Sequence, residues 1–202
     1  EASIPAPPKV GLVARTGVDF AKDAAAAPLD KIVAEHTRGN AAVSSTGELR
    51  HDPSAGRFEV DTPRTQGFAG FRSDAPIALG NVRIESKTPF AAVVVTALDD
   101  APIAASKHWL VTAAANAVNT GMALAPSGNG LADPGHSPIL VEPVEGSVGF
   151  AKLGGSLDHL TAYALGASGE RGSEVPLMRT RDGFILTLSP TSKTLHYEIV
   201  RK

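Results

Sequence analysis

Three polar residues close together in the sequence could bind a ligand: Asp61, Arg64 and Gln66. In extended backbone, residues two apart point to the same side, so Arg64 and Gln66 would share one face. A guanidinium offers a planar fork of donors and an amide offers both donors and acceptors, so the pair could hold sugar hydroxyls or a uronate. Two structural alternatives stand beside this one. Arg64 could pair with Asp61 or Glu59 at a strand corner, or the segment could form a domain interface.

Aromatic side chains are the next candidates, because an exposed ring can stack on the apolar face of a sugar. The sequence has one tryptophan, Trp109, and two tyrosines, Tyr163 and Tyr197. All three fall in predicted strands, where burial is expected more often than display. Trp109 remains a candidate for contact with carbohydrate or with a neighbouring domain. The small number of aromatic residues weighs against a strong sugar-binding platform.

Loop carboxylates favour a structural calcium over a zinc. Asp99, Asp100 and Asp133, together with Asn129, are oxygen donors in predicted loops, although the spacing of an EF-hand is absent. The six histidines include no pair four residues apart, and the chain has no cysteine. Zinc sites generally show tighter clustering of their ligands. No other cofactor is predicted.

Patterns for catalysis are weak. The sequence contains neither the Gly-x-Ser-x-Gly elbow of serine hydrolases nor a Gly-rich phosphate loop. Glu142 and Glu145 could pair as the carboxylates of a glycosidase do, but carboxylates in turns are usually solvated. The sequence therefore selects no catalytic residue.

Composition limits the class of protein. Of the 202 residues, 43% are hydrophobic and 20% charged, which is typical of a folded globular chain. A net charge of −2 provides no basic surface for a phosphate backbone, so nucleic acid is not an expected partner. The longest apolar run, Phe90–Leu98, is well short of the roughly 20 residues that span a bilayer, so no membrane partner is predicted either. The Pro/Ala-rich residues 1–8 read as a linker, and we expect the chain to be a piece of a longer polypeptide.

Short apolar runs separated by glycine, proline and Asp/Asn turns predict an all-β fold. Residues 48–61 predict a hairpin, because the alternating run Arg57–Asp61 follows an Asp-Pro-Ser-Ala-Gly turn. Phe90–Leu98, with three consecutive valines, predicts a central strand covered on both faces. His108–Ala114 is its expected partner.

The strands are predicted to form two modules. Residues 9–130 read as a β-sandwich-like module with at most one or two short helices, one of them at 29–35 with Asp30 as its cap. Residues 119–138 are rich in turn residues and form either a module boundary or a functional loop. Residues 138–202 hold six short, regularly spaced strands, as in a small immunoglobulin- or fibronectin-like sandwich. In its last hairpin, two apolar faces are expected, from Phe184, Leu186 and Leu188 and from Leu195, Tyr197 and Ile199.

Three parts of the sequence together resemble a region that follows the TIM-barrel catalytic domain in bacterial glycoside hydrolases. They extend over roughly residues 40–202, and the Asp-Thr-Pro-Arg-Thr-Gln block is the most specific of their motifs. The matching stretches are 45–50 with 58–67, then 91–98 with 105–107 and 119–122, and finally 193–199. The last of these resembles the final strand of an immunoglobulin-like domain at the end of many such enzymes.

The resemblance implies a noncatalytic accessory region of a secreted or periplasmic bacterial enzyme that degrades polysaccharides. Its expected partner is the catalytic TIM-barrel domain of the same parent protein, with polysaccharide as a second partner. It supplies no catalytic residues, because in such enzymes the acid/base pair lies on the barrel. Two alternatives remain open: a free-standing carbohydrate-binding module, and a β-sandwich polysaccharide lyase or hydrolase.

Overall fold

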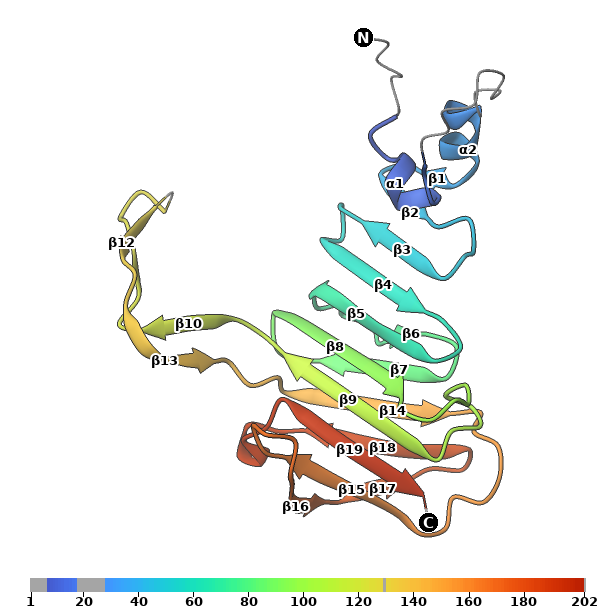
Figure 1. Cartoon of the computed structure of the whole chain (residues 1–202), viewed down its shortest axis with the longest axis vertical. Helices are drawn as coiled ribbons and strands as arrows, with labels where there is room; N and C mark the ends of the chain where they lie inside the picture. The colour runs from blue at the N-terminus through green and yellow to red at the C-terminus, as the bar shows by residue number, and fades with distance from the viewer. Residues whose placement is uncertain (1–6, 18–27, 129, 202) are drawn as a thin grey trace.

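The computed structural model describes residues 7–17, 28–128 and 130–201 of the chain, so most of the predicted linker and Asn129 lie outside the described residues. Two antiparallel sheets form the body of the protein (Figure 1). In sheet order, the larger one consists of β1 (Thr37–Arg38), β2 (Ala41–Val43), β3 (Leu49–Asp52), β4 (Arg57–Asp61), β5 (Thr65–Phe71), β8 (Phe90–Ala97), β9 (His108–Ala114), β19 (His196–Arg201), β15 (Leu160–Leu165) and β16 (Arg171–Val175). The smaller one consists of β17 (Leu177–Arg179), β18 (Gly183–Leu188), β14 (Gly146–Ala151), β7 (Val82–Ser86) and β6 (Ile77–Ala78). The predicted all-β fold with few short helices is confirmed.

The two sheets pack face to face over one hydrophobic core. Trp109 on β9 meets Phe150 and Phe184 of the smaller sheet edge to face, with ring centroids 6.0 Å apart, and the two phenylalanines stack at 4.5 Å. Along β8, Val93 and Val95 are fully buried, whereas the alternate residues are only half-buried. The predicted burial of this strand on both faces is wrong, because the smaller sheet covers only one face of the larger one.

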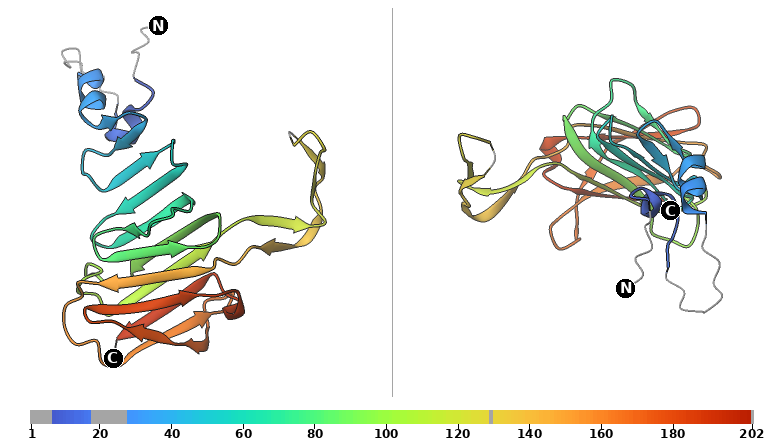
Figure 2. Two further views of the ribbon diagram at one scale, coloured as in Figure 1. Left: turned by 180° about the vertical axis from the view of Figure 1, so that it is seen from behind. Right: turned by 90° about the horizontal axis from the view of Figure 1, so that it is seen from above.

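The larger sheet continues past the sandwich as a single layer. Strands β1–β4 extend beyond β5, and two short helices, α1 (Val10–Val13) and α2 (Leu29–Glu35), pack at their far end (Figures 1 and 2). The helix predicted at 29–35 is confirmed, but Asp30 lies within its first turn and Pro28 precedes it, with no side-chain cap. No helix in the described ranges is long and apolar enough to cross a membrane.

Two predicted strand pairs are confirmed. β3 and β4 form the hairpin expected at 48–61, with Leu49 opposite Val60, and β8 pairs with β9. The last predicted hairpin is wrong, because β18 and β19 lie in different sheets. A short 3₁₀ turn at Pro190–Ser192 carries the chain from one sheet to the other. The two apolar faces therefore meet across the core instead of lying side by side.

The two predicted modules contribute strands to both sheets. From the range 9–130, β7 pairs with β14 of the range 138–202, and β9 pairs with β19. Buried residues of both ranges belong to one core cluster. The two ranges therefore share both sheets and one hydrophobic core.

An arm projects from the sandwich between β9 and β14. Its base is β10 (Ala117–Thr120) paired with β13 (His136–Val141), and its tip is β11 (Ala123–Leu124) paired with β12 (Leu131–Asp133). Both views of Figure 2 show it standing clear of the sandwich. The stretch 119–138, expected to be a boundary or a functional loop, is thus most of a two-stranded ribbon.

Candidate functional site

Asp61 and Gln66 hold the turn between β6 and β7 against the larger sheet. The Gly80 N–H donates to both carboxylate oxygens of Asp61, at 3.0 and 3.2 Å. The Asn81 N–H donates to Oε1 of Gln66 at 2.8 Å. Gln66 is only 3% exposed, and a Cβ placed on Gly80 would lie 2.8 Å from its Nε2. These two side chains therefore join one sheet to the other in this structure.

Arg64 is directed to a different loop. Its Nη2 donates to the Asp99 carbonyl at 2.6 Å, and its Nη1 lies 3.5 Å from the Asp100 carboxylate in the β8–β9 connection. The alternative partners considered from the sequence are engaged elsewhere, Glu59 with Arg57 at 2.8 Å and Asp61 with the β6–β7 turn. The structure does not bring the Arg64 and Gln66 side chains to a common surface.

Trp109 is completely buried in the sandwich. Its Nε1–H donates to the Ile103 carbonyl at 3.1 Å, and the Arg201 guanidinium lies 5.3 Å from its ring centroid. Tyr197 is buried as well. Neither ring is available to stack on a sugar without a change in the core.

The calcium candidates lie at two separate places. Asp99 and Asp100 are in the β8–β9 connection, whereas Asp133 is at the end of β12 on the arm, which leaves β9 from its opposite end. Burial raises the pKa of the Asp99 carboxyl, but hydrogen bonds such as that from the Lys107 N–H outweigh it and hold the pKa below its usual range. Among the described residues, no group of three or more His, Asp or Glu side chains could hold a metal ion.

A cluster of ionisable side chains lies on the outer face of the larger sheet. Arg171 donates through both Nε and Nη2 to the Glu198 carboxylate, and the His108 Nε2 is 2.7 Å from the same carboxylate. The guanidinium also lies 4.9 Å from the Tyr163 ring centroid. These hydrogen bonds, first that from Arg171, hold the pKa of Glu198 below its usual range. Its carboxylate is thus kept ionised and fully engaged.

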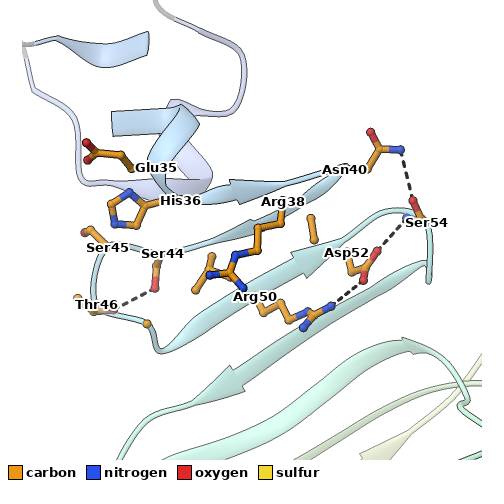
Figure 3. A pocket seen from close by; sticks show the side chains of 13 residues that line it. Glu35, His36, Arg38, Asn40, Ser44, Ser45, Thr46, Arg50, Asp52 and Ser54 are labelled. Atoms are coloured by element: carbon orange, nitrogen blue, oxygen red, sulfur yellow. Dashed lines mark hydrogen bonds and ion pairs between the residues drawn. The ribbon is translucent and has the colours of Figure 1, made fainter. Parts of the chain in front are cut away.

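A polar hollow of about 730 Å³ lies over β1–β3, on the side of the sheet opposite Ala42 and His51 (Figure 3). Figure 3 shows the Arg38 and Arg50 side chains on the same side of the sheet. Arg50 donates to Oδ2 of Asp52 at 2.9 Å. The other polar residues of its lining are Glu35, His36, Asn40, Ser44, Ser45, Thr46 and Ser54.

The arm carries a large exposed apolar surface. The side chains of Leu124 and Ile139 are 63% and 64% exposed. Other large apolar side chains are exposed on both strands of the base of the arm. The large exposed apolar residues of the arm are Val118, Leu124, Leu131, Ile139, Leu140 and Val141. Leu140 faces Val118 across the ribbon, whereas its neighbours Ile139 and Val141 point to the opposite face, so both faces of the ribbon are apolar.

Three exposed phenylalanines form a second apolar surface on the body of the protein, and we call Phe58, Phe71 and Phe90 the phenylalanine strip. All three are exposed on the outer face of the larger sheet, and Phe71 and Phe90 meet edge to face at 5.3 Å. β8 and β9 pair as far as Ala92 opposite Ala114. Phe90, on the strand next to β9, is therefore the member of the strip nearest to the point where the chain leaves β9 for the arm.

Sequence reasoning found neither the hollow nor the arm. The hollow is lined by side chains from three short strands and a turn, which no local motif links. The sequence does carry a signal for the arm. No Lys or Arg occurs between Lys107 and Lys152, and apolar residues such as Ile139 and Leu140 continue through the predicted loop. Neither protein-family models, nor curated proteins, nor solved structures give a match to this chain.

Proposed function

We propose that this chain is a noncatalytic accessory region of a polysaccharide-degrading glycoside hydrolase, secreted or periplasmic in a bacterium. The arm, residues 116–142, docks it onto the catalytic TIM-barrel domain of the same parent protein. The observation that carries the proposal is the apolar surface on both faces of the arm. Contiguous exposed apolar surface of this kind usually marks an interaction site.

The apolar side chains of the arm can contribute several kcal/mol toward the roughly 4–15 kcal/mol that association of two domains costs. Complete burial of a Val, Leu or Ile side chain contributes about 1.5–3 kcal/mol. The six apolar side chains of the arm are 38–64% exposed, so covering them would recover about half of that amount each, or roughly 6 kcal/mol in total.

The charge of the arm indicates the chemistry of the partner surface. Asp133 and Glu142 are the charged residues in the range 116–142 apart from His136, and no cation accompanies them. A complementary partner would present an apolar face rimmed by Lys or Arg. Electrostatic matching of this kind fixes the register of a complex more than its strength.

The ionisable cluster on the outer face supports the noncatalytic part of the proposal. A general acid or base at neutral pH needs a pKa near the working pH, which for a glutamate means a raised value. The pKa of Glu198 is lowered, and both its oxygens are occupied by Arg171 and His108. Such an arrangement is typical of a structural ion network, and it argues against the alternative of a lyase or hydrolase centred on these residues.

The docking is tested with the catalytic domain of the parent polypeptide, produced separately and mixed with the purified chain. Sedimentation velocity is expected to show a one-to-one complex. The variant Ile139→Ser/Leu140→Ser is expected to weaken it about tenfold or more, because two exposed apolar anchors are lost. Met178→Ser is the matched control, since Met178 is 60% exposed but lies on β17 in the smaller sheet.

Two results would overturn the proposal. One is the absence of a complex, or a complex that the arm variant leaves unchanged. The other is the release of sugar from a panel of polysaccharides by the isolated chain. A glycan array addresses the remaining alternative, because tight binding by the isolated chain without any docking would make it a free-standing carbohydrate-binding module.

A further inference from the structure

The hollow over β1–β3 brings two guanidinium groups to one surface. On one side of β2, Ala41 pairs with Arg38 of β1. On the other side of β2, Val43 pairs with Arg50 of β3. Arg38 and Arg50 therefore lie on the same face, two strands apart and offset by two residues along β2, with about 12 Å between their Cα atoms. Figure 3 shows both side chains extending over that face.

The negative charge beside them is already engaged. Asp52 accepts hydrogen bonds from Arg50 on Oδ2 and from the Ser54 and Ala55 N–H groups on Oδ1. The hydrogen bond from Arg50, followed by that from Ala55, holds the pKa of this carboxyl below its usual range. Glu35, at one end of the hollow, lies 3.9 Å from Lys31.

Arg38 is left as the uncompensated charge. Within the described residues it takes part in no ion pair, and it is exposed. Asp52 compensates the charge of Arg50, so the charge that Arg38 brings to this face is the one that a bound anion would balance. The hollow is therefore suited to a negatively charged group that both arginines can reach.

The other lining groups indicate what surrounds that anion. Ser45 is an exposed hydroxyl at one end, and the Asn40 amide, which donates to Ser54 at 3.3 Å, lies at the other. The His36 ring bonds the Ile32 carbonyl at 2.9 Å through Nδ1, which leaves Nε2 as an acceptor toward the hollow. Groups that both donate and accept fit the hydroxyls of a sugar.

We infer that this hollow binds an acidic sugar unit, with its carboxylate held by Arg38 and Arg50 and its hydroxyls by the surrounding polar groups. The inference rests on the proposed function for the source of the ligand, a uronate-containing polysaccharide. Arginine is suited to this role because its planar fork matches a carboxylate at two points. A hollow of about 730 Å³ also falls in the usual range for small-ligand sites.

Binding at this site depends on charge. The described lining contains no Phe, Tyr or Trp, so stacking contributes nothing beyond the His36 ring. We expect modest affinity that falls as salt rises, since exposed charges are screened within about 8 Å at physiological ionic strength.

The experiment is titration calorimetry on the full chain with trigalacturonate, with galactotriose as the neutral match. Trigalacturonate is expected to bind at least about tenfold more tightly, and Arg38→Ala to remove about tenfold of that affinity. Arg38→Lys keeps the charge but not the fork, so its affinity should fall between the two. Arg181→Ala is the matched control, because Arg181 is an exposed arginine in the turn after β17.

Equal binding of the acidic and neutral sugars, no binding of either, or an unchanged affinity of Arg38→Ala would overturn the inference. Inorganic phosphate binding as tightly as trigalacturonate would also overturn it, since the hollow would then be a general anion site. Docking is measured separately by sedimentation. Failure of the sugar site therefore leaves the docking result standing, and a failed docking leaves the calorimetry readable.

Discussion

Replacing Gln66 tests whether the Asp-Thr-Pro-Arg-Thr-Gln segment acts as a clamp between the sheets. Gln66→Leu keeps the approximate size of the side chain but removes the oxygen that accepts from the Asn81 N–H at 2.8 Å. Gln66 is 3% exposed, so water cannot readily replace that oxygen. Leaving a buried donor without a partner costs about 1–3 kcal/mol of unfolding free energy. For a chain of this size, 2 kcal/mol corresponds to a fall in Tm of about 4–8 °C.

The measurement is a thermal and a urea unfolding curve for the wild type, Gln66→Leu, Asp61→Asn and the double variant. Because Asp61 and Gln66 hold adjacent amides of one turn, the double variant should lose less stability than the two single variants added together. Arg64→Ala is the control, since Arg64 is half exposed and bonds a different loop. A Tm for Gln66→Leu within about 1 °C of the wild type would show that Gln66 does not hold the two sheets together, and Gln66 would again be a candidate for ligand binding.

Three further predictions concern stability. The pKa of Glu198 is lowered by its arginine and histidine partners, so the unfolded chain binds a proton at this group before the folded chain does as pH falls. The stability that Glu198 contributes is therefore present above pH 4.5 and is lost as pH falls below that value. This part of the pH dependence of unfolding should disappear in Glu198→Gln. Trp109→Ala should lose about 3–5 kcal/mol of unfolding free energy in urea denaturation, because the fully buried indole leaves a cavity against Phe150 and Phe184. EDTA should leave Tm unchanged, because the Asp99 carboxylate is held by hydrogen bonds such as that from the Lys107 N–H and Asp133 lies apart from it on the arm; a rise in Tm with added calcium, lost in Asp99→Asn, would contradict this.

Local pattern does not predict the strands of the arm or the half-buried outer face of β8, but it does predict many of the other strands and which side of them is buried. The alternation of Phe184, Leu186 and Leu188, all fully or nearly fully buried, is an example. The same pattern cannot tell whether the next strand pairs beside it or packs across from it. Hydrogen bonding within a sheet and packing between sheets both require one apolar face, and so the pattern predicts a hairpin for β18 and β19. Only contacts distant in sequence, such as Ile199 opposite Trp109, distinguish the two arrangements.

The polar residues chosen from the sequence illustrate a second limit. Residue type shows what Gln66 can bond, but not whether the bond is to a ligand or to a backbone amide 15 residues away. The hollow was missed for the opposite reason. Arg38 and Arg50 share one surface because their strands, β1 and β3, flank β2 in a register that points both side chains to the same side. Spacing in the sequence does not reveal that register.

The arm is expected to be only marginally stable without its partner. A two-stranded ribbon without a core is marginally stable in water, because its hydrogen bonds alone hardly offset the entropy of ordering the chain. In the described structure, β10 and β13 pair only with each other, and their apolar side chains are exposed on both faces. Their amides should therefore exchange with solvent nearly as fast as in an unfolded chain, whereas the amides of β8 and β9 in the core should be protected. Docking onto the catalytic domain should slow exchange selectively in residues 117–141, and hydrogen–deuterium exchange followed by mass spectrometry can resolve that range. Strong protection of the arm in the monomeric isolated chain would mean that the ribbon is stable without a partner, and the argument from its exposed apolar surface to docking would then fail.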